Sequence, residues 1–258
     1  MSGTKIHAYL RAGGAGSQHE RVGPFLATFT PGSTHPMRNY AIPDDDARPT
    51  RTEAGALIDA FARRALTPRL EYFDDAAPDV EAVLLAAGFR VDARLVVLGY
   101  RVGEEHPVEA PPRFSVALAG SERDHIDAMV VAGDAYGEPG APDAAAIGAR
   151  LRMVAAGGAV ALARHRSTGA PAGCGQVGVP HAGVSELAAV GVHAQFRSRG
   201  IAGAITALLT REAFARGLEL LWLTAESAQA ERIYARVGYR PIVGHMVHIS
   251  VPEVGGPG

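Results

Sequence analysis

The chain has 258 residues, of which 47% are hydrophobic and 20% are charged, and its formal net charge is −2. This composition is typical of a folded globular protein and excludes disordered and collagen-like classes. No apolar run approaches the roughly 20 residues that cross a bilayer. The length allows one large domain or two modest ones. A single cysteine, Cys174, excludes an intrachain disulfide, and together with an N-terminus that lacks an apolar leader it predicts a cytoplasmic protein.

Arginine supplies nearly all of the positive charge. Of the 25 basic residues only Lys5 is a lysine, and 27 acidic residues offset them. A nucleic-acid partner would require a clustered basic face, and the sequence shows none. We therefore expect neither nucleic acid nor a membrane as a partner.

A polar, proline-rich stretch at residues 103–112 separates two apolar-rich halves. Proline holds such a segment extended, and the segment has no apolar face to bury. The sequence therefore predicts a linker here, with one lobe at residues 1–108 and a second lobe at residues 113–252.

The second half alternates between helical and strand patterns. The predicted helices cover residues 121–136, 142–156, 201–216 and 228–236, and the predicted strands cover residues 159–166, 172–179, 185–192, 218–225 and 243–251. Gly217 and Gly238 follow two of these helices, where a left-handed glycine can end a helix. The order predicts an α/β domain with a mixed sheet flanked by helices.

The first half repeats part of this pattern at an offset of 150 residues. Residues 84–90 correspond to 234–240, residues 70–72 to 220–222, and residues 39–42 to 189–192. Matches at one constant offset favour an internal repeat and hence two similar lobes. The alternative is that two strand–helix units in an alanine-rich chain look alike through composition.

A glycine-containing loop between a predicted strand and a predicted helix carries the first chemical signal. It runs from Arg197 to Gly203 and begins with the pattern Arg-x-x-Gly-x-Ala. A helix N-terminus has unpaired N–H groups and a partial positive charge, so it binds phosphate well. Gly200 permits a pyrophosphate to approach closely, and the guanidinium groups of Arg197 and Arg199 can add charge-assisted contacts. Residues 11–16 also fit the pattern, but no amphipathic helix follows them, so the context favours the second copy.

Two further features flank this loop. Gly191 lies inside the preceding strand, where a glycine marks a bulge or a close backbone approach, although a glycine-rich chain also has such residues by chance. After the next strand, Ser227 is suited to cap a helix that carries Tyr234 on its apolar face. On spacing alone, Tyr234 is a core tyrosine.

Together these segments resemble the signature of the GNAT superfamily of N-acetyltransferases. Residues 192–202 are similar to its acyl-CoA loop, Arg/Gln-x-x-Gly-x-Gly/Ala, with Ala194 in place of a common proline. Residues 227–239 are similar to its second motif, Asn-x-x-Ala-x-x-Leu-Tyr-x-x-x-Gly-Phe. Ser227, Ile233 and Tyr239 stand at the Asn, Leu and Phe positions. The resemblance covers about residues 115–252 and implies a GNAT-like fold with acetyl-CoA as co-substrate and no metal.

The resemblance also implies roles for individual residues. Tyr234 takes the position of the family's general acid, which protonates the departing CoA thiolate. Glu186, eleven residues before Arg197, takes the position of the glutamate base of the family's histone acetyltransferases. Other members place the base elsewhere or use water, so the identity of the base remains open between Glu186, another residue and water. The residues implied to bind acetyl-CoA are Val190, Val192, Arg197, Ser198, Arg199, Gly200, Ile201, Ala202, Gly203 and Ser227.

At the offset of 150 the first half lacks this chemistry. Leu84 lies at the position of Tyr234, and Pro49 and Thr50 lie at the positions of Arg199 and Gly200. A proline has no N–H to offer a phosphate. We therefore expect the first lobe to be a degenerate copy that shapes the amine site or the architecture and does not bind CoA.

Other constellations are weaker. His245 and His248 would point to opposite faces of a strand, so they make a poor metal pair. Cys174 is expected to be a small buried residue.

Taken with the resemblance, the sequence predicts a two-lobed N-acyltransferase that moves acetyl from acetyl-CoA to a primary amine of a small molecule by direct attack. The alternatives are a non-catalytic acyl-CoA-binding sensor or scaffold, and an acetyltransferase that modifies protein lysines or N-termini. The acceptor amine is expected to contact the first two helices of the second half and their loop, around residues 134–141. The partners are therefore acetyl-CoA and an amine, and a homodimer is allowed.

Overall fold

Two compact units make up the chain. The computed structural model describes residues 2–13, 17–100 and 108–252. Unit 1 consists of residues 1–97 and 242–258, and unit 2 consists of residues 98–241. Most of the predicted linker, at residues 101–107, lies outside the described residues.

Two strands, β5 (Arg90–Tyr100) and β11 (Tyr239–Ser250), each begin in one unit and end in the other. Strand β5 begins in unit 1, and its last residues belong to unit 2. Strand β11 begins in unit 2 and continues into unit 1, where Met246 to Ser250 pair antiparallel with Phe73 to Arg69. We expected residues 242–252 in the second lobe. They belong to unit 1 because strand hydrogen bonds join this stretch to its sheet.

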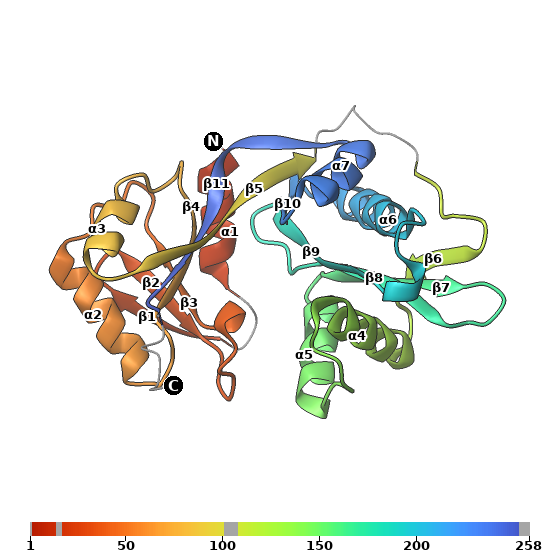
Figure 1. Cartoon of the computed structure of the whole chain (residues 1–258), viewed down its shortest axis with the longest axis horizontal. Helices are drawn as coiled ribbons and strands as arrows, with labels where there is room; N and C mark the ends of the chain where they lie inside the picture. The colour runs from red at the N-terminus through yellow and green to blue at the C-terminus, as the bar shows by residue number, and fades with distance from the viewer. Residues whose placement is uncertain (1, 14–16, 101–107, 253–258) are drawn as a thin grey trace. The chain divides into compact units, whose positions relative to one another are not determined.

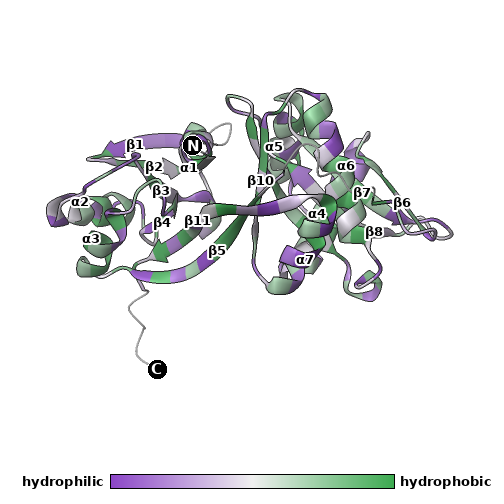
Figure 2. Ribbon diagram, turned by 90° about the horizontal axis from the view of Figure 1, so that it is seen from above, coloured by the Kyte–Doolittle hydropathy of each residue, from purple (hydrophilic) through white to green (hydrophobic). Residues whose placement is uncertain are grey.

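Unit 1 is a mixed sheet with helices, in the strand order β1-β2-β3-β4-β11-β5. Its other elements are α1 (Ser2–Ala12), β1 (Gln18–Val22), β2 (Phe25–Phe29), the 3-10 turn η1 (Pro36–Arg38), β3 (Tyr40–Pro43), α2 (Arg51–Ala62), β4 (Arg69–Phe73) and α3 (Val80–Ala86). The core joins sheet residues such as Tyr72 to Phe61 of α2 and Leu84 of α3. Strand β1, at the edge, is largely hydrophilic (Figure 2), as is common for strands with one unpaired side.

Unit 2 contains the elements predicted for residues 121–236, in the predicted order, whereas the last predicted strand, at residues 243–251, lies in unit 1. The elements that lie wholly in unit 2 are β6 (Phe114–Leu118), α4 (Glu122–Tyr136), α5 (Ala144–Ala155), β7 (Ala159–His165), β8 (Pro171–Val177), β9 (Val184–Val192), the 3-10 turn η2 (Ala194–Phe196), α6 (Ile201–Ala215), β10 (Leu220–Ala225) and α7 (Ala228–Val237). The strand order is β10-β9-β8-β7-β6, with β5 next to β10. Sequence analysis missed β6, because five residues are too few to establish a period.

Helices cover both faces of the sheet in unit 2. Successive residues of a strand face opposite sides. A Cβ on Gly175 of β8 would lie 2.7 Å from Ile205 of α6, whereas the neighbouring Cys174 packs against Ala128 and Val131 of α4. Helices α4 and α6 therefore lie on opposite faces, as Figure 1 shows. The predicted α/β class with a mixed sheet flanked by helices is confirmed.

The elements of the two units follow the predicted offset. Helices α2 and α6 begin at Arg51 and Ile201, which are 150 residues apart. The next elements keep this spacing within two residues: β4 and β10 begin at residues 69 and 220, α3 and α7 at 80 and 228, and β5 and β11 at 90 and 239. A constant spacing over four consecutive pairs of elements agrees with an internal repeat.

Candidate active site

Strands β9 and β10 part toward their carboxyl ends. Their parallel register comprises three pairs, of which Trp222 with Glu186 is the last. Strand β9 continues to Val192 and β10 to Ala225, beyond this register. Ligands of open α/β sheets bind at the carboxyl ends of the strands, so the divergence marks this edge of unit 2 as a candidate site.

A bulge interrupts β9 at the same edge. Cys174 of β8 pairs with Gly191, whereas Gln176 pairs with Ala188, so the register shifts between them. Ala189 adopts a positive φ of 53° within this bulge. The sequence singled out Gly191, and a Cβ there would lie 2.8 Å from the Cβ of Ala135 in α4. Gly191 thus permits a close helix approach, and the bulge lies just before it.

The loop before α6 leaves the helix N-terminus open. Gly200 is the N-cap residue with a φ of 82°, and Ser198, two residues earlier, has a φ of 61°. The first turn ends with Ala204 N–H donating to Gly200 C=O at 3.2 Å, so the three N–H groups before it have no acceptor inside the helix. Among the described residues no side chain caps α6, and its first turn contains no acidic residue. The positive end of the helix dipole is therefore free of an internal counter-charge.

The two loop arginines bond to the loop itself. The Nε of Arg197 donates to the carbonyl of Val192 at 3.2 Å, and an Nη of Arg199 donates to the carbonyl of Gln195 at 3.4 Å. Both side chains are otherwise exposed. A guanidinium has five N–H donors. Each arginine uses one donor in these bonds and therefore keeps others for a ligand. Their contact with a phosphate stays a prediction.

Helix α2, at the corresponding position of unit 1, is closed by its own side chains. Thr50 caps α2, and its hydroxyl accepts from Glu53 N–H at 3.2 Å. The Glu53 carboxylate in turn accepts from Thr50 N–H at 2.7 Å, which lowers the pKa of Glu53. A carboxylate already occupies the position that an anionic ligand would need. The Glu53 carboxylate is thus a second obstacle to phosphate binding at the start of α2, in addition to the missing N–H of Pro49.

Helix α1 bridges the parting strands of unit 1. Strands β3 and β4 are in register only at Ala41 with Leu70. Beyond this pair, Phe73 N–H donates to Nε2 of buried His7 at 2.7 Å, and Arg11 donates to the carbonyl of Pro43 at 2.9 Å. The carboxyl ends of β3 and β4 are therefore joined by side chains of α1.

Tyr234 and Glu186 lie on the elements that border the divergence of β9 and β10. Tyr234 is a half-buried residue of α7, and its ring meets that of Tyr239 edge-on at 6.3 Å between centroids. Burial, assisted by the Glu226 carboxylate, raises the pKa of Tyr234 to about 12. Glu186 belongs to the last registered pair of β9 and β10. Their catalytic roles stay predictions.

Ser227 caps α7 as predicted, since its hydroxyl accepts from Ala230 N–H at 3.2 Å. Its contact with CoA is untested. Val190 lies in the bulged part of β9 and Val192 at its end. Ile201, Ala202 and Gly203 form the first turn of α6.

Tyr136 and Glu226 are two residues near the candidate site that were not predicted from the sequence. The Tyr136 hydroxyl donates to the carbonyl of Val190 at 3.3 Å, while the residue as a whole is 52% exposed. Burial of the hydroxyl raises the pKa of Tyr136, and the nearby Tyr234, Glu226 and Glu186 add to this effect. The prediction that the acceptor meets residues 134–141 was the signal that could have identified this tyrosine. No sequence signal singled out Glu226, which is an ordinary polar residue after a strand.

Cys174 is a buried free thiol, as expected. His245 and His248 lie on β11 in unit 1, each near a carboxylate. In the described part of the chain, no group of three or more His, Cys, Asp or Glu residues is placed to hold a metal ion, and no helix there could span a bilayer.

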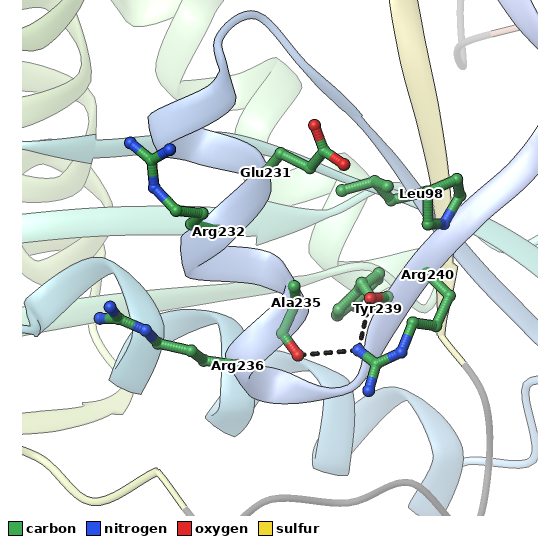
Figure 3. A pocket seen from close by; sticks show the side chains of 8 residues that line it. Leu98, Glu231, Arg232, Ala235, Arg236, Tyr239 and Arg240 are labelled. Carbon is green, nitrogen blue, oxygen red and sulfur yellow. Dashed lines mark hydrogen bonds between the residues drawn. The ribbon is translucent and has the colours of Figure 1, made fainter.

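A hollow of about 530 Å³ lies beside α7 in unit 2 (Figure 3). It is lined by Leu98, Glu231, Arg232, Ala235, Arg236, Tyr239, Arg240 and Pro241. The Arg240 guanidinium turns back to donate to the carbonyls of Ala235 and Tyr239 at 2.8 and 2.9 Å. Neither Tyr234 nor any residue of the loop before α6 lines this hollow, so it is distinct from the candidate site.

Comparison with known proteins agrees with this geometry. Residues 135–239 match the model of the Acetyltransferase (GNAT) family. These residues contain the bulged strand, the open helix N-terminus and Tyr234. The chain therefore carries a domain of the GNAT acetyltransferase family. Among curated proteins, none matches the chain.

Solved structures extend the similarity to both units. A GCN5-related N-acetyltransferase from Kribbella flavida is 25% identical, with a TM-score of 0.80 over 98% of this chain and 96% of that one. A tandem GNAT protein from the clavulanic acid biosynthesis pathway is 14% identical, with a TM-score of 0.65 over 100% of this chain and 89% of that one. A GCN5-related N-acetyltransferase from Sphaerobacter thermophilus is 16% identical, with a TM-score of 0.62 over 88% and 81% of the two chains. The fold of the chain is thus similar to the folds of solved GNAT proteins, one of which is a tandem GNAT protein.

Proposed function

We propose that the chain transfers acetyl from acetyl-CoA to the primary amine of a small molecule, by direct attack of the amine on the thioester. The observation that carries this proposal is the open N-terminus of α6 at the edge where β9 and β10 part. In a GNAT-family domain, this edge offers unpaired amides for a diphosphate and strand backbone for the pantetheine arm.

The diphosphate of acetyl-CoA would lie over the N–H groups of residues 199–203. The left-handed Gly200 supports this placement, because a glycine adds no side chain at the start of α6, where a Cβ would contact Pro111 at 3.6 Å. Arg197 and Arg199 would supply charge-assisted contacts. Val190 and Val192 would flank the pantetheine arm, and Ser227 would lie beside it at the start of α7.

Three steps of the chemistry involve groups of this chain. An amine with a solution pKa near 10 is mostly protonated at neutral pH, so Glu186 or a water molecule removes a proton before attack. The thioester carbonyl gains negative charge, which a backbone N–H of the β9 bulge would stabilise. The thiolate then departs with Tyr234 as the hydrogen-bond donor.

The pKa of Tyr234 defines how it acts. At about 12, this pKa keeps the hydroxyl protonated at neutral pH, so it is always available as a donor. The pKa of a thiol is about 8.5, so complete proton transfer to the thiolate is uphill. The hydroxyl therefore stabilises the leaving sulfur chiefly through a hydrogen bond.

Release of CoA thiol from acetyl-CoA, measured across a panel of amines, tests the proposal. The panel contains polyamines, amino acids, aminoglycosides and lysine-containing peptides, and acetyl-CoA binding is measured in parallel by calorimetry. Amine-dependent thiol release with small molecules is the expected result. Binding without turnover of any amine would instead identify a non-catalytic acyl-CoA-binding protein, and turnover of peptides alone would identify a protein acetyltransferase.

A further inference from the structure

Two side chains hold the backbone of the β9 bulge. The carbonyl of Ala189 accepts from the Cys174 thiol, with sulfur and oxygen 3.6 Å apart, and the carbonyl of Val190 accepts from the Tyr136 hydroxyl at 3.3 Å. Residues of a bulge lose their regular ladder partners. Here a thiol from β8 and a phenol from α4 act in place of strand partners.

The Cys174 contact determines where the next amide points. A trans peptide is planar, so the C=O of Ala189 and the N–H of Val190 point in opposite directions. Cys174 packs in the cluster on the α4 face of the sheet, and the Ala189 carbonyl is directed toward it. The Val190 N–H is therefore directed away from Cys174, on the opposite side of the peptide from the Ala189 carbonyl.

Both donors are protonated at neutral pH and come from elements that pack against β9. Burial raises the pKa of Cys174 to about 11, so its S–H is intact. Tyr136 is the last residue of α4, and the Cβ of the preceding Ala135 lies 2.8 Å from where a Cβ on Gly191 would be. The last turn of α4 therefore lies directly against β9, which fixes the tyrosine over the bulge.

We propose that Cys174 and Tyr136 are positioning residues for acyl transfer, which hold the bulge so that the Val190 N–H donates to the carbonyl of the bound thioester. This inference rests on the proposed function. Neither side chain needs to touch the reacting atoms. Each acts through the peptide group that it holds, and a preorganised backbone N–H is effective because it needs no reorientation during the reaction.

Conservative variants test the two side chains separately. Tyr136→Phe removes a hydroxyl and keeps the ring, and Cys174→Ala removes the S–H donor. Each should lower kcat about tenfold, because a donor displaced from the developing charge loses most of its effect. Acetyl-CoA affinity should change less than about twofold, since the diphosphate site is untouched. Cys174→Ser keeps a donor and should recover most of kcat.

The thioester carbonyl provides a readout that a purely structural role would not change. In acetyl-CoA labelled with ¹³C at the carbonyl, a hydrogen bond from Val190 lowers the C=O stretching frequency on binding to the wild-type chain. In Tyr136→Phe and Cys174→Ala this frequency should return toward its value in solution. Tyr72→Phe is the matched control, because it removes a hydroxyl that is buried in unit 1 and has no hydrogen-bond partner among the described residues.

The outcomes separate this inference from the proposed function. Wild-type kcat and stretching frequency in both variants would overturn the inference, as would a Cys174→Ser variant that behaves like Cys174→Ala. A wild-type chain that transfers acetyl without any lowering of the bound carbonyl frequency would overturn it while leaving the proposed function intact. A wild-type chain that neither binds acetyl-CoA nor releases thiol would remove the proposed function and the inference together.

Discussion

At the scale of single residues, Gly200 combines a left-handed φ with a position at the open end of α6. Gly200→Asp would place a carboxylate where the diphosphate is proposed to bind. We expect acetyl-CoA affinity to fall at least about tenfold, or about 1.4 kcal/mol. Calorimetry measures the loss. Gly200→Asn is the matched control, because it adds a side chain of similar size that tolerates positive φ and carries no charge. Equal affinities of the Asp and wild-type chains would refute the assignment of the loop.

Tyr234 and Tyr239 allow a comparison of two tyrosine hydroxyls in one unit. Tyr234→Phe should lower kcat about 10²-fold and leave acetyl-CoA binding nearly unchanged, because its bond to sulfur strengthens only as the thiolate leaves. Tyr239 is fully buried, and its hydroxyl pairs with Thr210 at 2.7 Å. Tyr239→Phe should therefore reduce stability by about 1 kcal/mol and preserve kcat. Full activity of a folded Tyr234→Phe chain would show that Tyr234 is a packing residue.

Glu186 acts, in this proposal, on the protonation of the amine. Glu186→Gln should lower the rate most at pH values below the amine pKa, where few amine molecules are free of their proton. As pH rises, the solution supplies neutral amine and the rate should partly recover. The measurement is a pH–rate profile for one amine. A profile with wild-type shape would assign the base role to water or to another residue.

At the scale of secondary structure, α1 is held to the sheet of unit 1 through a buried histidine. Burial is the main cause that lowers the pKa of His7 to about 4, and its Nδ1 contacts Asp45 at 2.9 Å. The folded chain therefore keeps His7 neutral at pH values where the unfolded chain, with a pKa near 6.5, binds a proton. Stability should fall as pH drops from about 6.5 to about 4 and then become independent of this group.

The size of this effect follows from the pKa difference. Between pH 7 and pH 4.5 the contribution of His7 should reduce the free energy of unfolding by about 2 kcal/mol. His7→Gln keeps an acceptor for Phe73 N–H but does not titrate, so its stability should depend less on pH by that amount. Urea unfolding of both chains at the two pH values gives the comparison. Parallel pH dependences would mean that His7 has the same pKa in the folded and the unfolded chain.

At the scale of the whole molecule, the two units differ in their capacity for an anionic ligand. In unit 1 the start of α2 holds the Glu53 carboxylate, and α1 bridges β3 and β4. In unit 2 the start of α6 is open. We expect one equivalent of acetyl-CoA per chain in a calorimetric titration, and at least about tenfold weaker binding in Gly200→Asp. Two equivalents would overturn the reading of unit 1 as a degenerate copy.

Features that depend on neighbours along the chain could be predicted from local residue patterns. The pattern from Arg197 to Gly203 predicted the loop before α6, because a helix start depends on a few consecutive residues. The constant offset of 150 predicted the repeat, and Ser227 was predicted as a cap from its place before a helical face. The resemblance to the GNAT superfamily rested on the same local motifs.

Features that join residues distant in the chain depend on tertiary packing. The Tyr136 hydroxyl meets Val190 across 54 positions, and Phe73 N–H meets His7 across 66. The exchange of β5 and β11 between the units likewise depends on which strand edges are free to pair, and an alternating pattern reports a strand but not its partner. Gly191 was a local sign of a bulge or a close approach in this strand, but the pairing with β8 around Gly175 decides that the bulge lies at Ala189. Hydrogen bonds between elements, and not residue order, thus hold the peptide groups of this bulge.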